Sequence, residues 1–338
     1  MVVAMDLDPK VLCYGLGVDD PKRIFGTTKN LKEKFGDKRV LDVPTSENAL
    51  MGIGSGVAIG GYRPVFVNQR FDFTLLAADQ IVNAAAKWYY MFGGKRGVPI
   101  VLRAVVGRGW GQGPTHSQCL HSWFAHIPGL KVVMPSTPAD AKGLLLSAIF
   151  DNNPVIFIEH RWLHNMEGPV PEGDYRVPIG EAGFMRKGED LTIVSSSYMS
   201  VEALHALGHL ESQGVTADLI DLRSVRPIDW KTIFNSVNKT GRLLVLDLGA
   251  ESASVGSEIV SRVTLECWST LQTKPEKISM PDKAQPTSPA LTKGFFPDEE
   301  TIINCIGKLL GKEFESADLL SKKDWPKDTP GSWFNGPF

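Results

Sequence analysis

Short apolar runs alternate along the chain with longer segments in which apolar residues recur at helical spacing. The runs at 98–104, 130–134 and 154–159 are apolar at almost every position, which is typical of parallel strands buried on both faces. The segment 138–150, between two of these runs, has the length and pattern of a helix. Such alternation predicts the α/β class, with doubly wound parallel sheets.

The same pattern continues through most of the chain and gives a full set of expected elements. Strands are expected at 10–14, 39–43, 64–68, 98–104, 130–134, 154–159, 191–195, 217–221 and 242–247. Helices are expected at 25–35, from 44–47 through 59, and at 75–92, 138–150, 200–213, 229–237, 252–266 and 297–310.

Composition breaks divide this series into two domains. Proline, glycine and charge concentrate around 160–181, which predicts a linker between two α/β units. We therefore expect a first domain at 1–165, a linker at 166–185, a second domain at 186–312 and an aromatic and proline-rich tail at 313–338. Trp325, Trp333, Phe334 and Phe338 give the tail enough apolar surface to dock on the body or on a partner.

Charge and composition exclude several function classes. The net charge of −2, with both signs interspersed, gives no basic surface for nucleic acid or an anionic membrane. The longest apolar runs are far too short to span a bilayer, and the first residues lack a secretory pattern. The four cysteines lie far apart without paired spacing, which indicates reduced thiols of a cytosolic protein.

Glu47 is the first residue with candidate chemistry. It follows the strand 39–43 and begins a glycine-rich apolar helix, facing the aromatic pair Phe71 and Phe73 further on. A carboxylate placed there could be aimed at a flat ligand, but spacing alone favours a helix-end carboxylate stabilised by the helix dipole, worth about 1 kcal/mol or less. The glycines of 52–56 indicate close helix packing better than a phosphate-binding loop.

Two further groups stand at loops. His116 follows a buried strand and a glycine-rich loop, where α/β sheets place ligand-binding groups, although a loop histidine bonded to backbone fits the pattern too. For His121 and His126 that simpler interpretation is stronger. The run 151–154, Asp-Asn-Asn-Pro, joins a helix to a strand, and a simple Asx turn explains it without a ligand.

Several stretches in fixed order carry a resemblance to a known family. They are DVPTSENALMGIGSGVAIGGYRPVF, DQIVNAAAKWYYMFGG, VPIVLR, HSQ followed by WFAHIPGLKVVMPSTPADAKGLLLSAIFDNNPVIFIE, and LIDLRSVRPID. Together they span most of the chain. The chain resembles the β subunit of the thiamine-diphosphate-dependent decarboxylase component of 2-oxoacid dehydrogenase complexes, of the pyruvate and branched-chain types.

The resemblance implies a thiamine pyrimidine-binding domain followed by a transketolase C-terminal-like domain. It places the family's pyrimidine-binding glutamate on Glu47, the stacking aromatic on Phe73 with Phe71 beside it, and the active-site histidine on His116. A carboxylate hydrogen-bonded to the pyrimidine favours the tautomer that accepts the cofactor's reactive proton. The family's histidine serves proton transfer and acyl transfer to lipoyl-lysine.

The resemblance also implies ions and partners. Ile100, Ala148, Asp151 and Asn153 match positions that hold a structural potassium ion through oxygen atoms. Mg²⁺ and the diphosphate are held in this family by a GDG…N motif, which the chain lacks. We therefore expect an α-type subunit to supply that motif in an α2β2 assembly, with a lipoyl acyltransferase as a further partner. The expected location is the cytoplasm, or the mitochondrial matrix after removal of a transit peptide.

Some positions depart from the family pattern. Leu16 stands where a glutamate relays protons between sites, Asn68 and His121 replace common glutamates, and Arg70 adds a cation to the substrate-facing stretch, whereas Asp79 of the relay is retained. The family's first helix is absent or very short here. These departures leave open a decarboxylase or carboligase with an aldehyde acceptor, and a non-catalytic paralogue.

Overall fold

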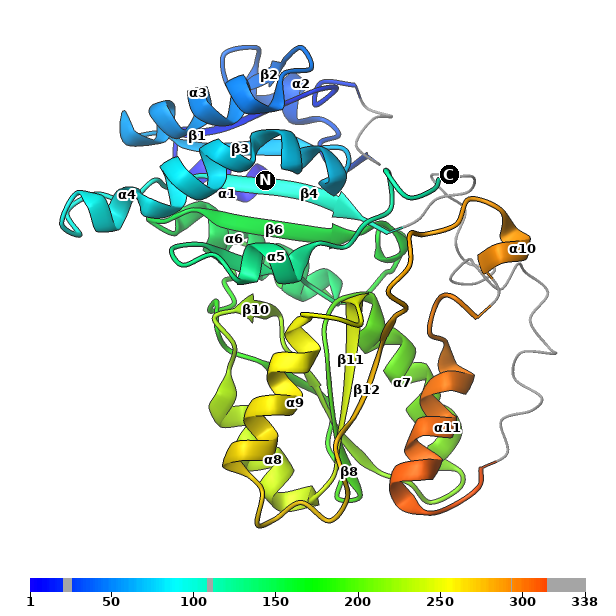
Figure 1. Ribbon diagram of the computed structural model, residues 1–338. Coiled ribbons are helices and arrows are strands. Elements are labelled where there is room, and N and C mark those ends of the chain that lie inside the picture. Colours follow the sequence, from blue (N-terminus) through cyan, green and yellow to red (C-terminus); the bar gives the residue numbers. More distant parts are fainter. Residues whose placement is uncertain (21–25, 108–111, 293, 315–338) are drawn as a thin grey trace. The chain divides into compact units, whose positions relative to one another are not determined.

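The chain folds into two α/β domains, each built on its own sheet. The computed structural model describes residues 1–20, 26–107, 112–292 and 294–314, and the predicted aromatic tail lies almost entirely outside these residues (Figure 1). Contacts group the described residues into a first domain, 1–107 with 115–179, and a second domain, 112–114 with the residues from 180 onward. None of the helices formed by the described residues has the length and apolar character needed to cross a membrane.

The first domain's own strands are all parallel and lie in the order β5-β6-β4-β3-β1-β2. These strands are β1 (Val11–Gly15), β2 (Val40–Asp42), β3 (Arg63–Asn68), β4 (Val101–Val106), β5 (Lys131–Val133) and β6 (Val155–His160). The helices between them are α1 (Val2–Leu7), α2 (Leu31–Phe35), α3 (Glu47–Ile59), η2 (Phe71–Ala77), η3 (Gln80–Ala85), α4 (Ala86–Met91), α5 (His121–Ala125), α6 (Pro138–Phe150) and η4 (Arg161–Leu163).

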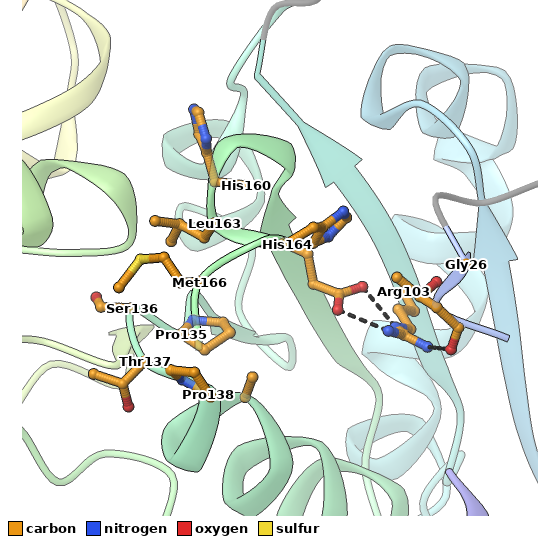
Figure 2. Close-up of a pocket in the computed structure, with 13 residues that line it drawn as sticks. Gly26, Arg103, Pro135, Ser136, Thr137, Pro138, His160, Leu163, His164 and Met166 are labelled. Carbon is orange, nitrogen blue, oxygen red and sulfur yellow. Dashed lines mark hydrogen bonds and ion pairs between the residues drawn. The ribbon is translucent and has the colours of Figure 1, made fainter. Parts of the chain in front are cut away.

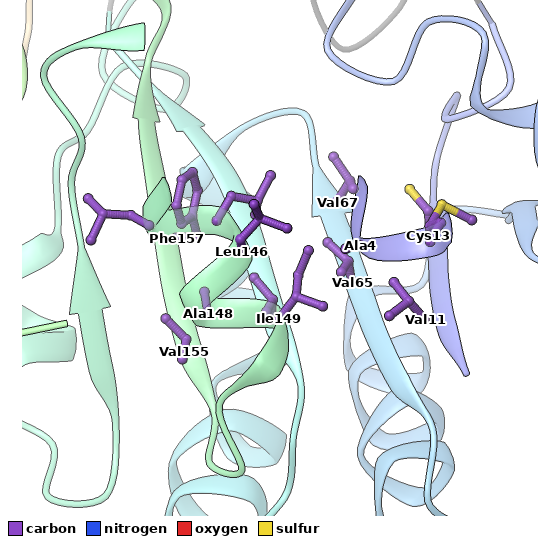
Figure 3. Packing of buried hydrophobic residues seen from close by; sticks show 14 of the residues in the cluster. Ala4, Val11, Cys13, Val65, Val67, Leu146, Ala148, Ile149, Val155 and Phe157 are labelled. Carbon is purple, nitrogen blue, oxygen red and sulfur yellow. The ribbon is translucent and has the colours of Figure 1, made fainter. Parts of the chain in front are cut away.

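One face of this sheet is covered by α6 and α1. Leu146 and Ile149 of α6 meet Phe157 of β6 and Val65 of β3 in a continuous apolar core (Figure 3). The strands β4 and β6 are buried along their whole length, as their largely apolar runs predict, and their buried polar residues are Arg103, Glu159 and His160. Helix α6 begins at its predicted residue, because the Thr137 side chain accepts a hydrogen bond from the Asp140 amide and caps the helix.

Two expected helices differ from the prediction. The helix expected at 25–35 covers only Leu31–Phe35, because Asn30 adopts a left-handed φ of 64° that cannot continue a helix backwards. The single helix expected at 75–92 is instead the 3₁₀ segment η2, the π segment η3 and the short α4. The wider turns of η3 keep Ile81 and Ala85 both in the core.

The second domain has a mixed sheet in the order β12-β11-β8-β9-β7. Its strands are β7 (Gly183–Arg186), β8 (Leu191–Ser195), β9 (Ala217–Asp221), β11 (Leu243–Ala250) and β12 (Glu276–Met280), with β10 (Ser224–Arg226) following β9 in the chain. Its helices are α7 (Tyr198–Glu211), α8 (Trp230–Thr240), α9 (Val255–Glu266), α10 (Pro289–Thr292) and α11 (Glu299–Leu310).

Helices α7 and α11 cover one face of this sheet, and α8 and α9 cover the other (Figure 1). The domain is therefore doubly wound, as predicted. Strand β7 begins within the segment expected as linker and pairs antiparallel with β9, the one antiparallel pairing recorded for the two sheets within the described residues. Every second residue of β7 is exposed, so the strand has no continuous buried run in the sequence and was not predicted.

Candidate active site

The carboxyl ends of neighbouring parallel strands bring the predicted site residues to one edge of the first sheet. Glu47 follows β2, Phe73 follows β3, and His116 follows β4. These strands, with β1 among them, are consecutive in the sheet and point the same way. In open α/β sheets this edge is where ligands bind.

Glu47 is the first residue of α3, and it is half-buried. The preceding Ser46 makes no capping hydrogen bond through its side chain, so the helix dipole favours the Glu47 carboxylate at this end. Helix α3 lies tight against the sheet, because a Cβ added to Gly54 would stand 1.9 Å from the Tyr14 hydroxyl oxygen. The predicted role in close helix packing is confirmed for Gly54, whereas a Cβ added to Gly56 would have no neighbour within 4 Å.

The two phenylalanines of η2 face different surroundings. Phe71 is fully buried and its ring packs at 5.1 Å, tilted, on Phe124 of α5. Phe73 keeps 36% of its surface exposed. Of the two aromatic residues, Phe73 therefore presents a free face to a ligand, while Phe71 supports η2 from beneath.

Phe73 and His116 meet directly, although they are 43 positions apart in the sequence. Their ring centroids are 5.4 Å apart with an interplanar angle of 88°, an edge-to-face contact. His116 is exposed, and its Nδ1 lies 3.0 Å from the Thr115 hydroxyl oxygen. The structure thus brings together an aromatic surface and an accessible imidazole at the edge where Glu47 begins its helix.

Asp72 holds this arrangement in place, and sequence reasoning missed it. One oxygen of its buried carboxylate accepts hydrogen bonds from the side-chain amide of Gln118 at 2.8 Å and from the Gln118 backbone amide at 3.2 Å. Since Asp72 precedes Phe73 and Gln118 lies two residues after His116, this bond fixes the two rings against each other. The available signal was an acidic residue enclosed by two phenylalanines, which is rare unless it has a partner.

Two buried polar groups at this edge have no partner within the described chain. The Ser117 hydroxyl, in a residue with 2% exposure, and the side-chain nitrogen of Asn68 at the end of β3 make no hydrogen bond. Buried polar groups are normally paired, and ligands satisfy many exceptions. The open face of Phe73 and these groups fit a flat heteroaromatic ring that carries hydrogen-bonding atoms.

Leu16 and His121, which depart from the family pattern, and the retained Asp79 each have a partner within the described chain. Leu16 is exposed, and its backbone carbonyl accepts a hydrogen bond from Gln69 at 2.9 Å. Asp79 is exposed and accepts hydrogen bonds from Asn83 and Gln80. His121 is buried, with its Nδ1 at 3.2 Å from the Cys119 sulfur.

The four potassium-site candidates gather at the opposite edge of the sheet. Ile100 precedes β4, Ala148 belongs to the last turn of α6, and Asp151 and Asn153 form the turn before β6. The Asx turn is confirmed, because the Asn153 amide donates to Asp151 Oδ1 at 2.9 Å.

The oxygens of this turn already have partners. Arg63 donates to the backbone carbonyls of Ile149 and Asp151 at 3.1 and 2.8 Å, and Lys131 pairs with the Asp151 carboxylate. The Ile100 and Ala148 carbonyls each accept one backbone amide, which leaves a second lone pair on each oxygen. These carbonyl oxygens and the Asp151 carboxylate are hard oxygen donors of the kind that alkali cations take, and two protein cations already contact the turn.

The first domain also contains a cavity of about 340 Å³ that none of the predicted site residues lines (Figure 2). Its charged wall is a two-pronged ion pair, in which Arg103 contacts the two carboxylate oxygens of Glu159 at 2.6 and 2.7 Å. Burial alone would raise the pKa of Glu159, but Arg103 outweighs burial and holds it below its usual value. Burial, with His164 and Arg161 nearby, lowers the pKa of His160 to about 3, so this imidazole is neutral.

Comparison with known protein families agrees with the two-domain architecture. Residues 1–166 match the transketolase pyrimidine-binding domain, and residues 180–302 match the transketolase C-terminal domain. Among solved structures, a split-gene transketolase described as an inactive beta4 tetramer superposes with a TM-score of 0.72 at 21% identity, covering 93% of this chain and 96% of that one. At this identity the likeness concerns the fold.

Sequence relatives give the family. The β subunit of acetoin:2,6-dichlorophenolindophenol oxidoreductase of Cupriavidus necator is 42% identical, with 88% of this chain and 91% of that protein covered. The pyruvate dehydrogenase E1 component subunit beta of Rhizobium meliloti is 40% identical, with 90% and 67% covered. The 2-oxoisovalerate dehydrogenase subunit beta of Bacillus subtilis is 37% identical, with 88% and 92% covered. The chain belongs to this family of thiamine-diphosphate-dependent dehydrogenase β subunits, which combine a transketolase pyrimidine-binding domain with a transketolase C-terminal domain.

Proposed function

We propose that this chain is the β subunit of a heteromeric enzyme that decarboxylates a 2-oxoacid with thiamine diphosphate. The observation that carries the proposal is the contact between Phe73 and His116 at the carboxyl edge of the sheet on which Glu47 begins α3. Aromatic face, imidazole and carboxylate are the three groups that the pyrimidine half of such a site needs from this subunit.

Each of the three residues has a distinct task. Thiamine diphosphate, when bound, supplies an acidic carbon that adds to a 2-oxo group and takes up the electrons left by departing carbon dioxide. Glu47 would accept a hydrogen bond from the pyrimidine ring and so hold the proton-accepting tautomer. Phe73, supported by Phe71, would provide the stacking surface, and the exposed His116 would donate or accept the proton at the reacting end of the substrate.

The other half of the site is proposed to come from an α-type subunit. No GDG motif occurs in the sequence, so nothing here corresponds to the family's ligands for Mg²⁺ and diphosphate. We therefore assign Mg²⁺ to the partner, and expect an α2β2 assembly with each cofactor held jointly by two chains. The family's usual compartments, the cytoplasm or the mitochondrial matrix, are the proposed locations.

We propose a lipoyl-lysine carrier as the acyl acceptor, because relatives named as pyruvate and 2-oxoisovalerate dehydrogenase subunits match over nearly the whole chain. A second candidate is cleavage of acetoin or transfer to an aldehyde, which two relatives named as acetoin oxidoreductase subunits favour. A role as a non-catalytic paralogue is disfavoured by the retention of Glu47 and His116, which a scaffold does not need.

Potassium is proposed as a structural ion at the turn formed by Asp151 and Asn153. The carbonyl oxygens of Ile100 and Ala148, each of which accepts a backbone amide, support it, and the ion would brace the amino ends of β4 and β6. A rise in melting temperature with K⁺ over Na⁺ at equal ionic strength is expected. Equal melting temperatures in the two salts would contradict this ion site alone.

The test of the main proposal is reconstitution. The chain is co-expressed with the α-type subunit encoded beside it and assayed on a panel of 2-oxoacids and on acetoin, with and without a lipoyl domain. Release of carbon dioxide from a 2-oxoacid with acylation of the lipoyl domain is the expected result. Turnover of acetoin, or of a 2-oxoacid with an aldehyde only, would select the second candidate. No turnover in any arm, from an assembled complex containing cofactor, would refute the enzymatic proposal.

A further inference from the structure

Helices α7 and α11 of the second domain bring two histidines and two glutamates together. Glu202, His205 and His209 stand three and then four positions apart on α7, so they share one face of that helix. Glu299 is the first residue of α11, which packs beside α7 (Figure 1). The four side chains thus come from two helices that are distant in sequence and adjacent in space.

The distances within this cluster suit a shared metal ion better than direct hydrogen bonds. One ligating atom each from Glu202, His205 and Glu299 can be chosen so that all lie within 4.8 Å of one another. His205 Nδ1 lies 3.6 Å from one oxygen of Glu299, and His209 Nε2 lies 3.6 Å from the other. Hydrogen bonds of this kind measure about 2.7–3.2 Å, whereas ligand atoms around a tetrahedral zinc ion with bonds of about 2.0–2.1 Å are about 3.3 Å apart.

Burial makes a cation favourable at this point. Glu202 and Glu299 keep only 3% and 8% of their surface exposed, and two buried carboxylates at short range strongly favour a positive charge between them.

A supporting hydrogen bond and an entry path are also present. The Tyr198 hydroxyl donates to one oxygen of Glu202 and so orients the carboxylate. Such outer hydrogen bonds are typical of metal-binding carboxylates. The side chains of His205 and His209 remain 44% and 43% exposed, so an ion can reach the cluster from solvent.

We propose that Glu202, His205 and Glu299 bind a transition-metal dication of the zinc class, with His209 as a fourth ligand or as a partner of Glu299. A set of imidazole and carboxylate donors selects zinc, cobalt or nickel over magnesium and calcium, which prefer oxygen alone. The ion would join α7 to α11, and so attach the last described helix to the sheet of the second domain. The role is structural and separate from the reaction.

The test uses the full chain after dialysis against a chelator, with Co²⁺ alone as the probe. Tetrahedral Co²⁺ absorbs in the visible range, so the site reports itself independently of activity. We expect saturation at one Co²⁺ per chain, displacement by Zn²⁺ but not by Mg²⁺, and a higher melting temperature with Zn²⁺. His205→Ala and Glu299→Gln should each weaken Co²⁺ binding at least tenfold, while His126→Ala, an exposed histidine elsewhere, should leave it unchanged.

Circular dichroism confirms that each variant is folded before titration. His209→Ala distinguishes the two arrangements: a fourth ligand predicts at least tenfold weaker binding, and a partner of Glu299 predicts a smaller loss. Absence of saturable visible absorption in the wild-type chain would overturn the proposal, leaving only ion pairs between imidazolium and carboxylate. Equal Co²⁺ affinity in wild type and His205→Ala would overturn it as well.

Discussion

Two polar clusters, one in each domain, differ in how far their hydrogen bonds are completed within the chain. At the carboxyl edge of the first sheet, Phe73 and His116 stand open, and the buried Ser117 hydroxyl has no partner in the described chain. In the second domain Asp218, with 2% exposure, accepts hydrogen bonds from Ser236 at 2.7 Å and from the Gly188 amide at 3.0 Å.

That second network is completed inside its own domain. Lys239 lies 2.8 Å from the Asp218 carboxylate, and the Thr192 hydroxyl links Ser236 to Thr240 at 2.7 and 2.8 Å. A satisfied buried network stabilises a fold, whereas an incomplete one at a sheet edge is where a ligand binds.

The largest effect is expected for Glu47, at the carboxyl edge of the first sheet. Glu47→Gln keeps the shape and removes the charge, so the reconstituted complex should lose roughly 10²–10⁴-fold in turnover. The free energy of unfolding should change by less than about 0.5 kcal/mol, because the residue is half-buried at a helix end. Steady-state kinetics and urea unfolding measure the two quantities. Glu33→Gln, another first-turn glutamate, is the control, and activity of Glu47→Gln equal to that of this control would remove the proposed role.

Asp218→Ala should lower stability and leave turnover unchanged, the reverse of Glu47→Gln. Removing the carboxylate leaves the buried Gly188 amide without its acceptor and takes one partner each from Ser236 and Lys239, and a buried donor left unpaired costs about 1–3 kcal/mol of unfolding free energy. Activity per folded molecule should be unchanged. Asp174→Ala, which breaks the exposed pair with Arg176, should cost less than about 1 kcal/mol. Equal urea midpoints for the two variants would show that the Asp218 network contributes no more to stability than an exposed ion pair.

Asp72→Ala tests whether the bonds from Gln118 to Asp72 hold His116 in position against Phe73. Without the bonds to Gln118, the loop that carries His116 can move away from Phe73. A displacement of about 1 Å in a catalytic group costs up to about 10²-fold in rate. We expect kcat to fall by about 10–100-fold with a smaller change in KM. Asp72→Asn keeps an oxygen that accepts from Gln118, so it should recover most of the loss. Similar losses in both variants would mean that Asp72 acts by its charge and not by this bond.

At neutral pH the smallest effect concerns His160 in the wall of the cavity. Its pKa is lowered to about 3 in the folded chain, so the unfolded chain binds more protons between pH 6.5 and about 3. Stability should be complete above pH 6.5 and should fall with pH through this window, by up to about 1.4 kcal/mol per pH unit. Urea unfolding at several pH values should show a flatter profile for His160→Gln. His126→Gln should keep the wild-type slope, and a His160→Gln slope equal to it would contradict the assignment.

The elements that the sequence predicted well are those whose signal is local. The buried strands β4 and β6 are largely apolar runs, and α6 has both its capping threonine and its proline at the start. The 3₁₀ and π segments that replace one long helix could not be predicted, because packing of Ile81 and Ala85 against the core decides them.

In the candidate site, too, some features have a local sequence signal and others depend on contacts between distant residues. Glu47 and His116 could be placed at strand ends from the order of elements alone, although their importance came from the resemblance. The contact between Phe73 and His116 depends on the bond from Gln118 to Asp72, which joins positions 46 residues apart. No local pattern carries that pairing. Likewise, nothing in the spacing of Glu202 and His205 reveals that Glu299 completes their cluster.

The central claim is that this chain supplies the pyrimidine half of a shared thiamine diphosphate site. Calorimetric titration of the cofactor with Mg²⁺ tests it directly, on the chain alone, on the complex with its α-type partner, and on the complex carrying Phe73→Ala. We predict no binding to the chain alone, saturable binding to the complex, and at least tenfold weaker binding with Phe73→Ala. Binding to the chain alone as tight as to the complex, or an unchanged affinity in the variant complex, would contradict the account.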